Sequence, residues 1–164
     1  MDQAIDKDEL VAELRRLVEV DLDAITAGQQ ASQEGATHAE NKAEGDKDMR
    51  STESSYLARG LAKRVLELRT AVSKLSNLNN RVFGTESPVA MSALVELEDE
   101  DEQREWYYIA PSGGGIVVDL AGHKISVITP TSPLARAMIG RYLDDEVELQ
   151  TPQGPKTLTL THLS

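Results

Sequence analysis

The hydrophobic residues of this chain follow one period in the first half and another in the second. From Asp8 to about Gln33, apolar and small residues recur every three or four positions, which is typical of a helix that buries one stripe. Asp6 or Asp8 is suited to cap its start. Because the stripe shrinks from leucine to glycine and alanine, we expect a partner helix to approach closely near its far end. The predicted stripe is Leu10, Leu14, Leu17, Ala24, Gly28 and Ala31, with Asp21 as its one charged member.

A second helical stripe follows after an acidic interval, and it consists of Leu57, Leu61, Val65, Leu68, Val72 and Leu75. Each segment lacks proline and can bury only one side, so we expect an antiparallel helical hairpin (coiled coil) over residues 1–78. The interval at 34–48 reads EGATHAENKAEGDKD. It holds five acids and two glycines but no large apolar residue, which predicts an acidic tip for the hairpin.

After residues 79–90, which we interpret as a linker, the period changes to two. This pattern predicts an antiparallel sheet with turns at DEDEQ, PSGGG and TPQG. One short helix interrupts the strands, with Ser132 as N-cap, Pro133 at its first position and Gly140 at its end. Residues 91–164 are thus predicted to form an α+β domain. The expected strands are 91–97, 104–110, 116–119, 124–128, 146–150 and 157–163.

Composition narrows the classes of function. The formal net charge is −11, with 15 acids and 11 bases up to Asn80 and 13 acids and 6 bases after it. Neither part has the basic patch of an autonomous DNA-binding protein. The absence of cysteine excludes disulfides and cysteine-ligated zinc. No apolar run approaches the ~20 residues that cross a bilayer, and the first ten residues lack the apolar core of a secretory signal. We therefore expect a soluble, cytoplasmic monomer without membrane contact.

Four short motifs recur in order along the second half: SPLAR at 132–136, IG at 139–140, DDEV at 144–147 and TPQG at 151–154. Together they resemble the C-terminal domain of the bacterial Gre transcription elongation factors (GreA and GreB). The segment LAKRVLELRTAVSKLSNL at 61–78 resembles the second hairpin helix of the same family. The resemblance implies an FKBP-like fold for the second half of the chain.

The resemblance also implies a partner, bacterial RNA polymerase. In this family the C-terminal domain docks at the rim of the polymerase secondary channel, and the hairpin reaches the active centre. Acids in a G-D-x-x-E-N tip help to hold a second Mg²⁺, and the polymerase then cleaves the 3′ end of backtracked RNA. Such a factor is not itself an enzyme. It has no cofactor of its own, because the Mg²⁺ belongs to the polymerase active site.

The tip of this chain departs from the family motif. Glu40 and Asn41 match its E-N, but Ala36 stands at the aspartate position and one extra residue separates glycine from glutamate. Gly45-Asp46 repeats the G-D, but Met49 follows where an acid is expected. The candidates for assisting cleavage are therefore Glu40 with one or more of Glu44, Asp46 and Asp48, and those for Mg²⁺ are Glu40 and Asp46.

Three functions stay open for the hairpin. Its tip assists cleavage, or it enters the channel as a regulator without cleavage, or the hairpin is an adaptor for an unrelated protein partner. The structural alternative for the interval at 34–48 is a solvated loop. His38 is a possible metal ligand, although an exposed loop histidine is the simpler interpretation. Arg59 and Lys63 are candidates for contact with the channel wall or RNA, against the alternative of a face that is charged only for solubility.

The remaining motifs have one functional and one structural interpretation each. Ser132, Pro133, Leu134 and Arg136 are candidates for binding polymerase, or else they form a well-capped core helix. The acidic run at 99–102 is expected to be a solvated turn. Prolyl isomerase activity requires an aromatic pocket. The chain has one Trp and one Phe, and Phe83 lies in the predicted linker, so we do not expect this activity. The glycines at 113–115 are not followed by the Lys-Ser/Thr of a phosphate-binding loop, so we do not expect a nucleotide site there.

Overall fold

The computed structural model describes the backbone of residues 4–40 and 47–164 and the side chains of residues 4–31 and 52–164. The chain forms two compact units, of which one joins Met1–Arg15 to Lys74–Ser164 and the other is Arg16–Ser73. The first residues of the hairpin therefore belong to the same unit as the β domain. The sequence interpretation instead placed the hairpin in residues 1–78 and the β domain in residues 91–164. Among the described helices, none combines the length and the apolar character that a membrane span requires.

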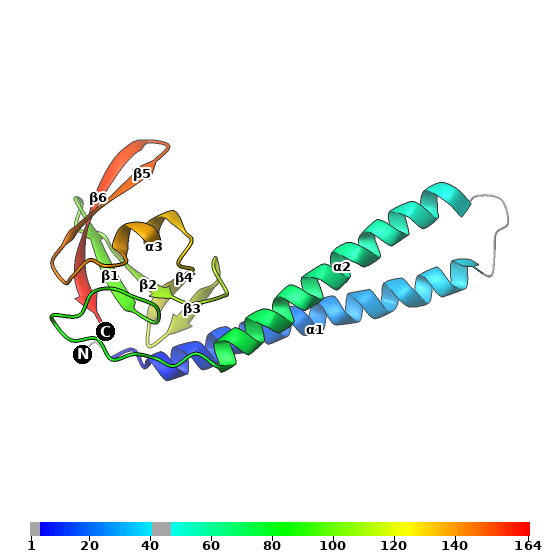
Figure 1. Cartoon of the computed structure of the whole chain (residues 1–164), viewed down its shortest axis with the longest axis horizontal. Helices are drawn as coiled ribbons and strands as arrows, with labels where there is room; N and C mark the ends of the chain where they lie inside the picture. Colours follow the sequence, from blue (N-terminus) through cyan, green and yellow to red (C-terminus); the bar gives the residue numbers. More distant parts are fainter. Residues whose placement is uncertain (1–3, 41–46) are drawn as a thin grey trace. The chain divides into compact units, whose positions relative to one another are not determined.

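The first half forms the expected helical hairpin of α1 (Lys7–Glu40) and α2 (Lys47–Ser76), which run antiparallel and side by side in Figure 1. Asp6 is the N-cap, since its Oδ1 accepts the N–H of Asp8 at 2.8 Å and of Glu9 at 3.2 Å. Both helices extend further into the acidic interval than expected. Alanine, glutamate and lysine favour the helix there, and a single glycine opposes it by only about 1 kcal/mol.

The buried stripe of α1 differs from the predicted one beyond Leu17. Val18 is buried and Leu22 and Ile25 are half-buried, whereas Gly28 is exposed and a Cβ added there would meet nothing within 4 Å. The expected close approach at the small residues is therefore wrong. Val, Leu and Ile take the inner side because they remove more apolar surface from water than Gly or Ala. The exposed members of the predicted stripe also include Ala24 and Ala31.

The stripe of α2 is confirmed from Leu61 to Leu75. Val65 and Leu68 are buried, and Leu61 and Val72 are half-buried. Leu57, which the period also places on this stripe, is 64% exposed. The burial of α2 therefore weakens toward its N-terminal part.

The second half forms one six-stranded sheet of order β3-β4-β2-β1-β6-β5. All neighbours pair antiparallel except β2 and β4, which are parallel. This pair corrects the expected wholly antiparallel sheet. β3 and β4 form a tight hairpin with positive φ at Ala121 and Gly122, and β4 instead of β3 is the strand of this hairpin that lies beside β2. The strands are β1 (Leu94–Asp99), β2 (Arg104–Ile109), β3 (Val117–Leu120), β4 (His123–Ile128), β5 (Glu146–Thr151) and β6 (Gly154–Leu163).

The acidic run at 99–102 forms the turn between β1 and β2, as predicted. Asp99 Oδ1 accepts the backbone N–H of Asp101 at 3.0 Å and of Gln103 at 2.9 Å, and Lys156 Nζ lies 3.0 Å from Asp99 Oδ2. The bond from Gln103, followed by the one from Lys156, holds the pKa of Asp99 below its ordinary value. One carboxylate of the run is thus used to close the turn.

The helix α3 (Pro133–Met138) packs on one face of the sheet, where Met138 joins a core with Val95, Leu97 and Ile109. Phe83 also belongs to this core and is 8% exposed. The sequence interpretation that placed Phe83 in a linker outside the domain is therefore wrong. The segment folds back onto the domain because Phe83 and its neighbours bury apolar area there.

The other face of the sheet buries Leu94, Tyr108 and Ile125. The start of α1 belongs to the same unit, and a Cβ added at Gly113 would lie 3.0 Å from Leu14 Cδ1. Gly113 has φ +86, so both conformation and space favour glycine there. The β domain and the base of α1 therefore share one packed interior.

Candidate docking site

The start of α3 is built by its own capping residues. Ser132 has extended backbone angles, and its hydroxyl accepts the N–H of Ala135 at 3.2 Å. Pro133 occupies the first helical position, where its missing N–H is not needed. Leu134 is half-buried against the core. These three predicted docking residues thus have structural roles as well, because they fix where α3 begins and how it lies on the sheet.

Arg136 differs from them because its side chain points away from the core. It is exposed, and no described side chain pairs with its guanidinium. Its helix contributes Ala135 and Met138 to the buried side instead. Of the four predicted residues, Pro133 and Arg136 are exposed, and Arg136 is the charged one that can contact a partner.

The loop after α3 adds residues that the sequence analysis missed. Ile139 and Tyr142 are 41% and 46% exposed although both are large and apolar. The loop is held in place, since Gly140 N–H donates to Val89 O at 2.9 Å and Val89 N–H donates to Arg141 O at 2.8 Å. Gly140 has φ +88 and ends the helix, and this glycine was the available signal that its neighbours lie at the surface.

We call Arg136, Ile139, Arg141 and Tyr142 the α3 patch. Tyrosine and arginine are enriched where proteins bind each other, because they combine large contact area with hydrogen-bond donors. The two arginines give the patch positive charge in a chain whose formal net charge is −11. The arrangement suits a protein partner with acidic and apolar residues.

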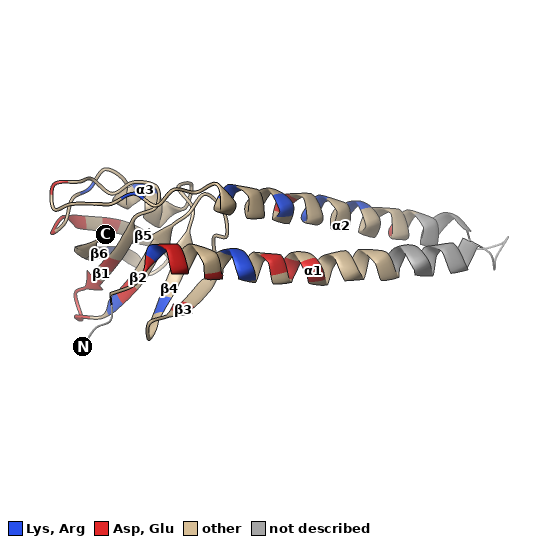
Figure 2. Cartoon of the chain, turned by 90° about the horizontal axis from the view of Figure 1, so that it is seen from below, with Lys and Arg blue, Asp and Glu red and all other residues tan. Residues whose placement is uncertain are grey.

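Arg59 and Lys63 lie on the exposed side of α2, as their prediction requires. Tyr56 and Leu66, also exposed, share this side at successive turns, and the buried stripe lies opposite. Figure 2 shows basic residues recurring along α2, while acids gather on α1. From residue 52 onward, α2 carries two acids, Glu53 and Glu67, against the cations Arg59, Lys63, Arg64, Arg69 and Lys74.

The predicted tip residues lie outside the part of the chain whose side chains the structure describes. This applies to Glu40, Glu44, Asp46 and Asp48, and to His38. Their pairing and the Mg²⁺ ligands Glu40 and Asp46 therefore stay predictions. Within the described residues, no group of three or more His, Asp or Glu side chains is placed to hold a metal ion.

Residues 84–164 match the family model of the C-terminal domain of the transcription elongation factors GreA and GreB. Through this domain, the chain belongs to the Gre family. The matched segment begins directly after the core residue Phe83 and includes all six strands, α3 and the whole α3 patch. The family resemblance of the second half is therefore confirmed, and the hairpin lies outside the matched segment.

Individual Gre proteins match over a similar part of the chain. The transcription elongation factor GreA of Methylobacterium sp. (strain 4-46) is 38% identical over 96 residues, which are 57% of this chain and 56% of that protein. The transcription elongation factor GreB of Pseudomonas aeruginosa is 38% identical over 98 residues, which are 60% of this chain and 50% of that protein. The chain thus spans about half of the length of these curated relatives.

A solved structure is also similar over most of the chain. GreA factor homolog 1 (Gfh1) of Thermus thermophilus aligns with 92% of this chain and 94% of its own, at 17% identity and a TM-score of 0.40.

Proposed function

We propose that this Gre-family chain binds bacterial RNA polymerase and acts as a transcription elongation factor. The observation that carries the proposal is the GreA/GreB C-terminal domain over residues 84–164, together with the exposed α3 patch on that domain. The relatives that match this domain bear the name transcription elongation factor. Docking takes place through the α3 patch at the rim of the secondary channel, and the protein works in the bacterial cytoplasm, where its partner is.

The hairpin supplies the second part of the proposed activity. Glu40, with Glu44, Asp46 or Asp48, brings carboxylate oxygens to the active centre of the polymerase, and Mg²⁺ prefers such hard ligands. Metal ions in such a centre stabilise the attacking and leaving oxygens of the displacement. The polymerase then cleaves backtracked RNA, and this protein assists without being an enzyme or carrying its own cofactor. Arg59 and Lys63 contact the channel wall or the RNA.

A second candidate is a regulator that occupies the channel without promoting cleavage. The departure of the tip from the family motif, with Ala36 where an aspartate is expected, favours it. In that case the hairpin still enters the channel, but its carboxylates do not converge. The two candidates share the α3 docking surface and differ only in what the tip does.

A transcript-cleavage assay separates them. Artificially backtracked polymerase complexes with Mg²⁺ receive the wild type, Glu40→Ala, or Glu53→Ala as a matched loss of an exposed helical acid. If the protein promotes cleavage, we expect the wild type and Glu53→Ala to be active. Glu40→Ala should lower the cleavage rate at least about tenfold, which corresponds to a barrier higher by about 1.4 kcal/mol. Binding without cleavage selects the regulator. A wild type that does not bind the complexes contradicts both candidates.

A further inference from the structure

The β domain has a second feature, a pocket that opens on the sheet face opposite α3. Its lining includes Glu96 and Trp106, which alternate along their strands with Val95, Leu97 and Tyr107. The alternating residues face α3 and its core. The pocket has a volume of about 430 Å³, which is within the range of ligand sites. We call it the Trp106 pocket, and it shares no residue with the α3 patch.

Three aromatic rings, those of Trp106, His123 and His162, line the Trp106 pocket. The ring centroid of Trp106 lies 5.3 Å from that of His123 and 5.0 Å from that of His162, with tilts of 59° and 56°. The strand register brings this about, because Glu96 is paired with Trp106 on one side and with His162 on the other. Three π systems therefore line one hollow whose wall also holds a carboxylate.

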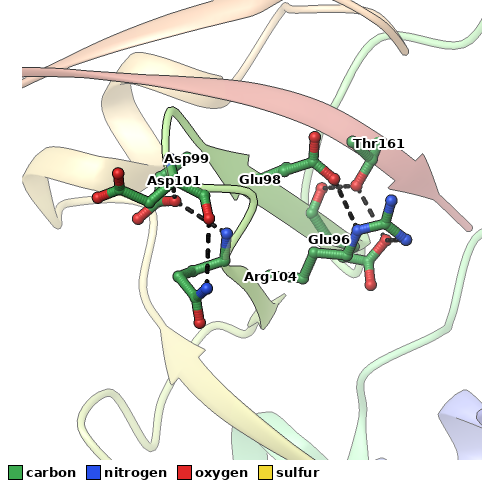
Figure 3. A network of polar contacts seen from close by, with 7 residues as sticks. Glu96, Glu98, Asp99, Asp101, Arg104 and Thr161 are labelled. Atoms are coloured by element: carbon green, nitrogen blue, oxygen red, sulfur yellow. Dashed lines mark hydrogen bonds and ion pairs between the residues drawn. The ribbon is translucent and has the colours of Figure 1, made fainter.

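The carboxylate of Glu96 is held by its neighbours. Thr161 Oγ1 donates to Glu96 Oε2 at 2.9 Å, and Arg104 Nη1 lies 3.9 Å from the same oxygen. Arg104 makes its shorter contact elsewhere, with Nε 2.6 Å from Glu98 Oε2. Figure 3 shows Arg104 between Glu96 and Glu98, with Thr161 beside Glu96. The side chain of Glu96 is 15% exposed, and that of Arg104 is 59% exposed.

The charges of the Trp106 pocket leave a surplus of negative charge. One guanidinium, that of Arg104, serves two carboxylates, those of Glu96 and Glu98. Burial lowers the pKa of His162, and Glu96 opposes this to a smaller extent, so the site disfavours a positive charge on this ring. A hollow with aromatic walls and an incompletely neutralised carboxylate favours a cation, which gains both cation–π and ionic attraction.

We propose that the Trp106 pocket binds an arginine side chain presented by a protein partner. Its guanidinium stacks on Trp106 and donates hydrogen bonds to Glu96. Arginine suits the pocket better than lysine because its planar group both stacks on rings and bridges carboxylate oxygens. A nucleobase would also stack on Trp106, but its phosphate would approach Glu96 in a chain of net charge −11. The α3 patch is cationic and this pocket is anionic, so the two surfaces should bind partner groups of opposite charge.

Trp106 is the only tryptophan of the chain and reports directly on its own pocket. The full-length protein is titrated with a capped Gly-Arg-Gly peptide, with the same peptide carrying uncharged citrulline, and with a short single-stranded RNA. We expect saturable change in Trp106 emission with the arginine peptide, at a Kd on the order of 1 mM, and at least about tenfold weaker binding of citrulline. Equal binding of both peptides, no saturable change, or stronger binding of the RNA would overturn the proposal.

Two variants should move the affinity in opposite directions. Glu96→Gln keeps the shape of the side chain and removes its charge, so we expect about tenfold weaker binding of the arginine peptide. Arg104→Gln removes the cation that competes for Glu96, so binding should become severalfold tighter. Glu100→Gln, in the exposed turn, changes the net charge as Glu96→Gln does and should bind like the wild type. If Glu96→Gln and Glu100→Gln behave alike, general charge attraction explains the binding and the proposal fails.

Discussion

At the scale of single residues, a chain of hydrogen bonds runs from the buried Tyr108 to the exposed Asp8 and links distant segments. The buried Tyr108 hydroxyl donates to Asn80 Oδ1, and Asn80 Nδ2 donates to Asp8 Oδ1 at 2.7 Å. Burial, with a smaller effect of Asp8, raises the pKa of Tyr108, so this hydroxyl stays protonated and remains a donor. The chain of bonds joins the start of α1 and the segment after α2 to strand β2.

Removing the Tyr108 hydroxyl should therefore destabilise the β domain. We expect Tyr108→Phe to lower the free energy of unfolding by about 1–3 kcal/mol, because the half-buried Asn80 loses its donor. Tyr142→Phe removes the same atom from an exposed ring and should stay within about 0.5 kcal/mol of the wild type. Urea unfolding followed by Trp106 emission measures both. Equal stability of Tyr108→Phe and the wild type would contradict a stabilising role for this bond.

The stability of the β domain should also depend on pH through His162. Because burial lowers the pKa of His162, the unfolded chain binds this proton more readily than the folded one. Folding therefore loses stability as the pH falls through the unfolded value of about 6.5. We expect the free energy of unfolding to decrease between about pH 7.5 and about pH 5.5, and to decrease less in His162→Gln. Parallel curves for the two proteins would contradict this assignment.

At the scale of elements, the sequence predicts most of the structure because local patterns decide it. The strands and the capped helix α3 lie close to their expected places, since alternation and the Ser132-Pro133 start are local signals. The stripe of α1 was mispredicted where two periodic sets competed, and Val18 and Ile25 prevailed over Ala24 and Gly28. The parallel pairing of β2 with β4 depends on contacts across the sheet, which no local pattern encodes.

The two sides of α2 offer a matched pair of leucines. Leu68 is 5% exposed and Leu66 is 66% exposed. We expect Leu68→Ala to lower the free energy of unfolding of the hairpin by about 2–5 kcal/mol, because it leaves a cavity. Leu66→Ala should change it by less than about 0.5 kcal/mol. Thermal unfolding followed by helical circular dichroism measures both, and similar losses would contradict the assignment of the buried side.

The candidate sites were less predictable than the fold. Arg136 was found from a motif, but Ile139 and Tyr142 were missed, because apart from the helix-ending Gly140 beside them nothing in the sequence distinguishes exposed from buried apolar residues. The Trp106 pocket was missed for a related reason. Its members come from β1, β2, β4 and β6, and only the strand register brings Glu96, Trp106 and His162 together. A sequence shows which residues are present but does not show which of them meet across a sheet.

At the scale of the whole molecule, different surfaces are proposed to bind different partners. The α3 patch, with exposed Arg136 and Tyr142, is proposed to dock on RNA polymerase. The acidic interval of the hairpin is proposed to act at the active centre, and the Trp106 pocket is proposed to receive an arginine. Both proposed functions of the hairpin require that the protein first docks on the polymerase, so they depend on the α3 patch.

The most direct test is the affinity of the full-length chain for core RNA polymerase, measured for the wild type and three variants. We expect Arg136→Glu and Tyr142→Ala each to weaken binding at least about tenfold, or about 1.4 kcal/mol, with unchanged circular dichroism. Lys124→Glu makes the same charge reversal at a site that is 77% exposed on β4, and it should bind like the wild type. If Arg136→Glu and Tyr142→Ala bind as tightly as the wild type, the α3 patch is not the docking surface.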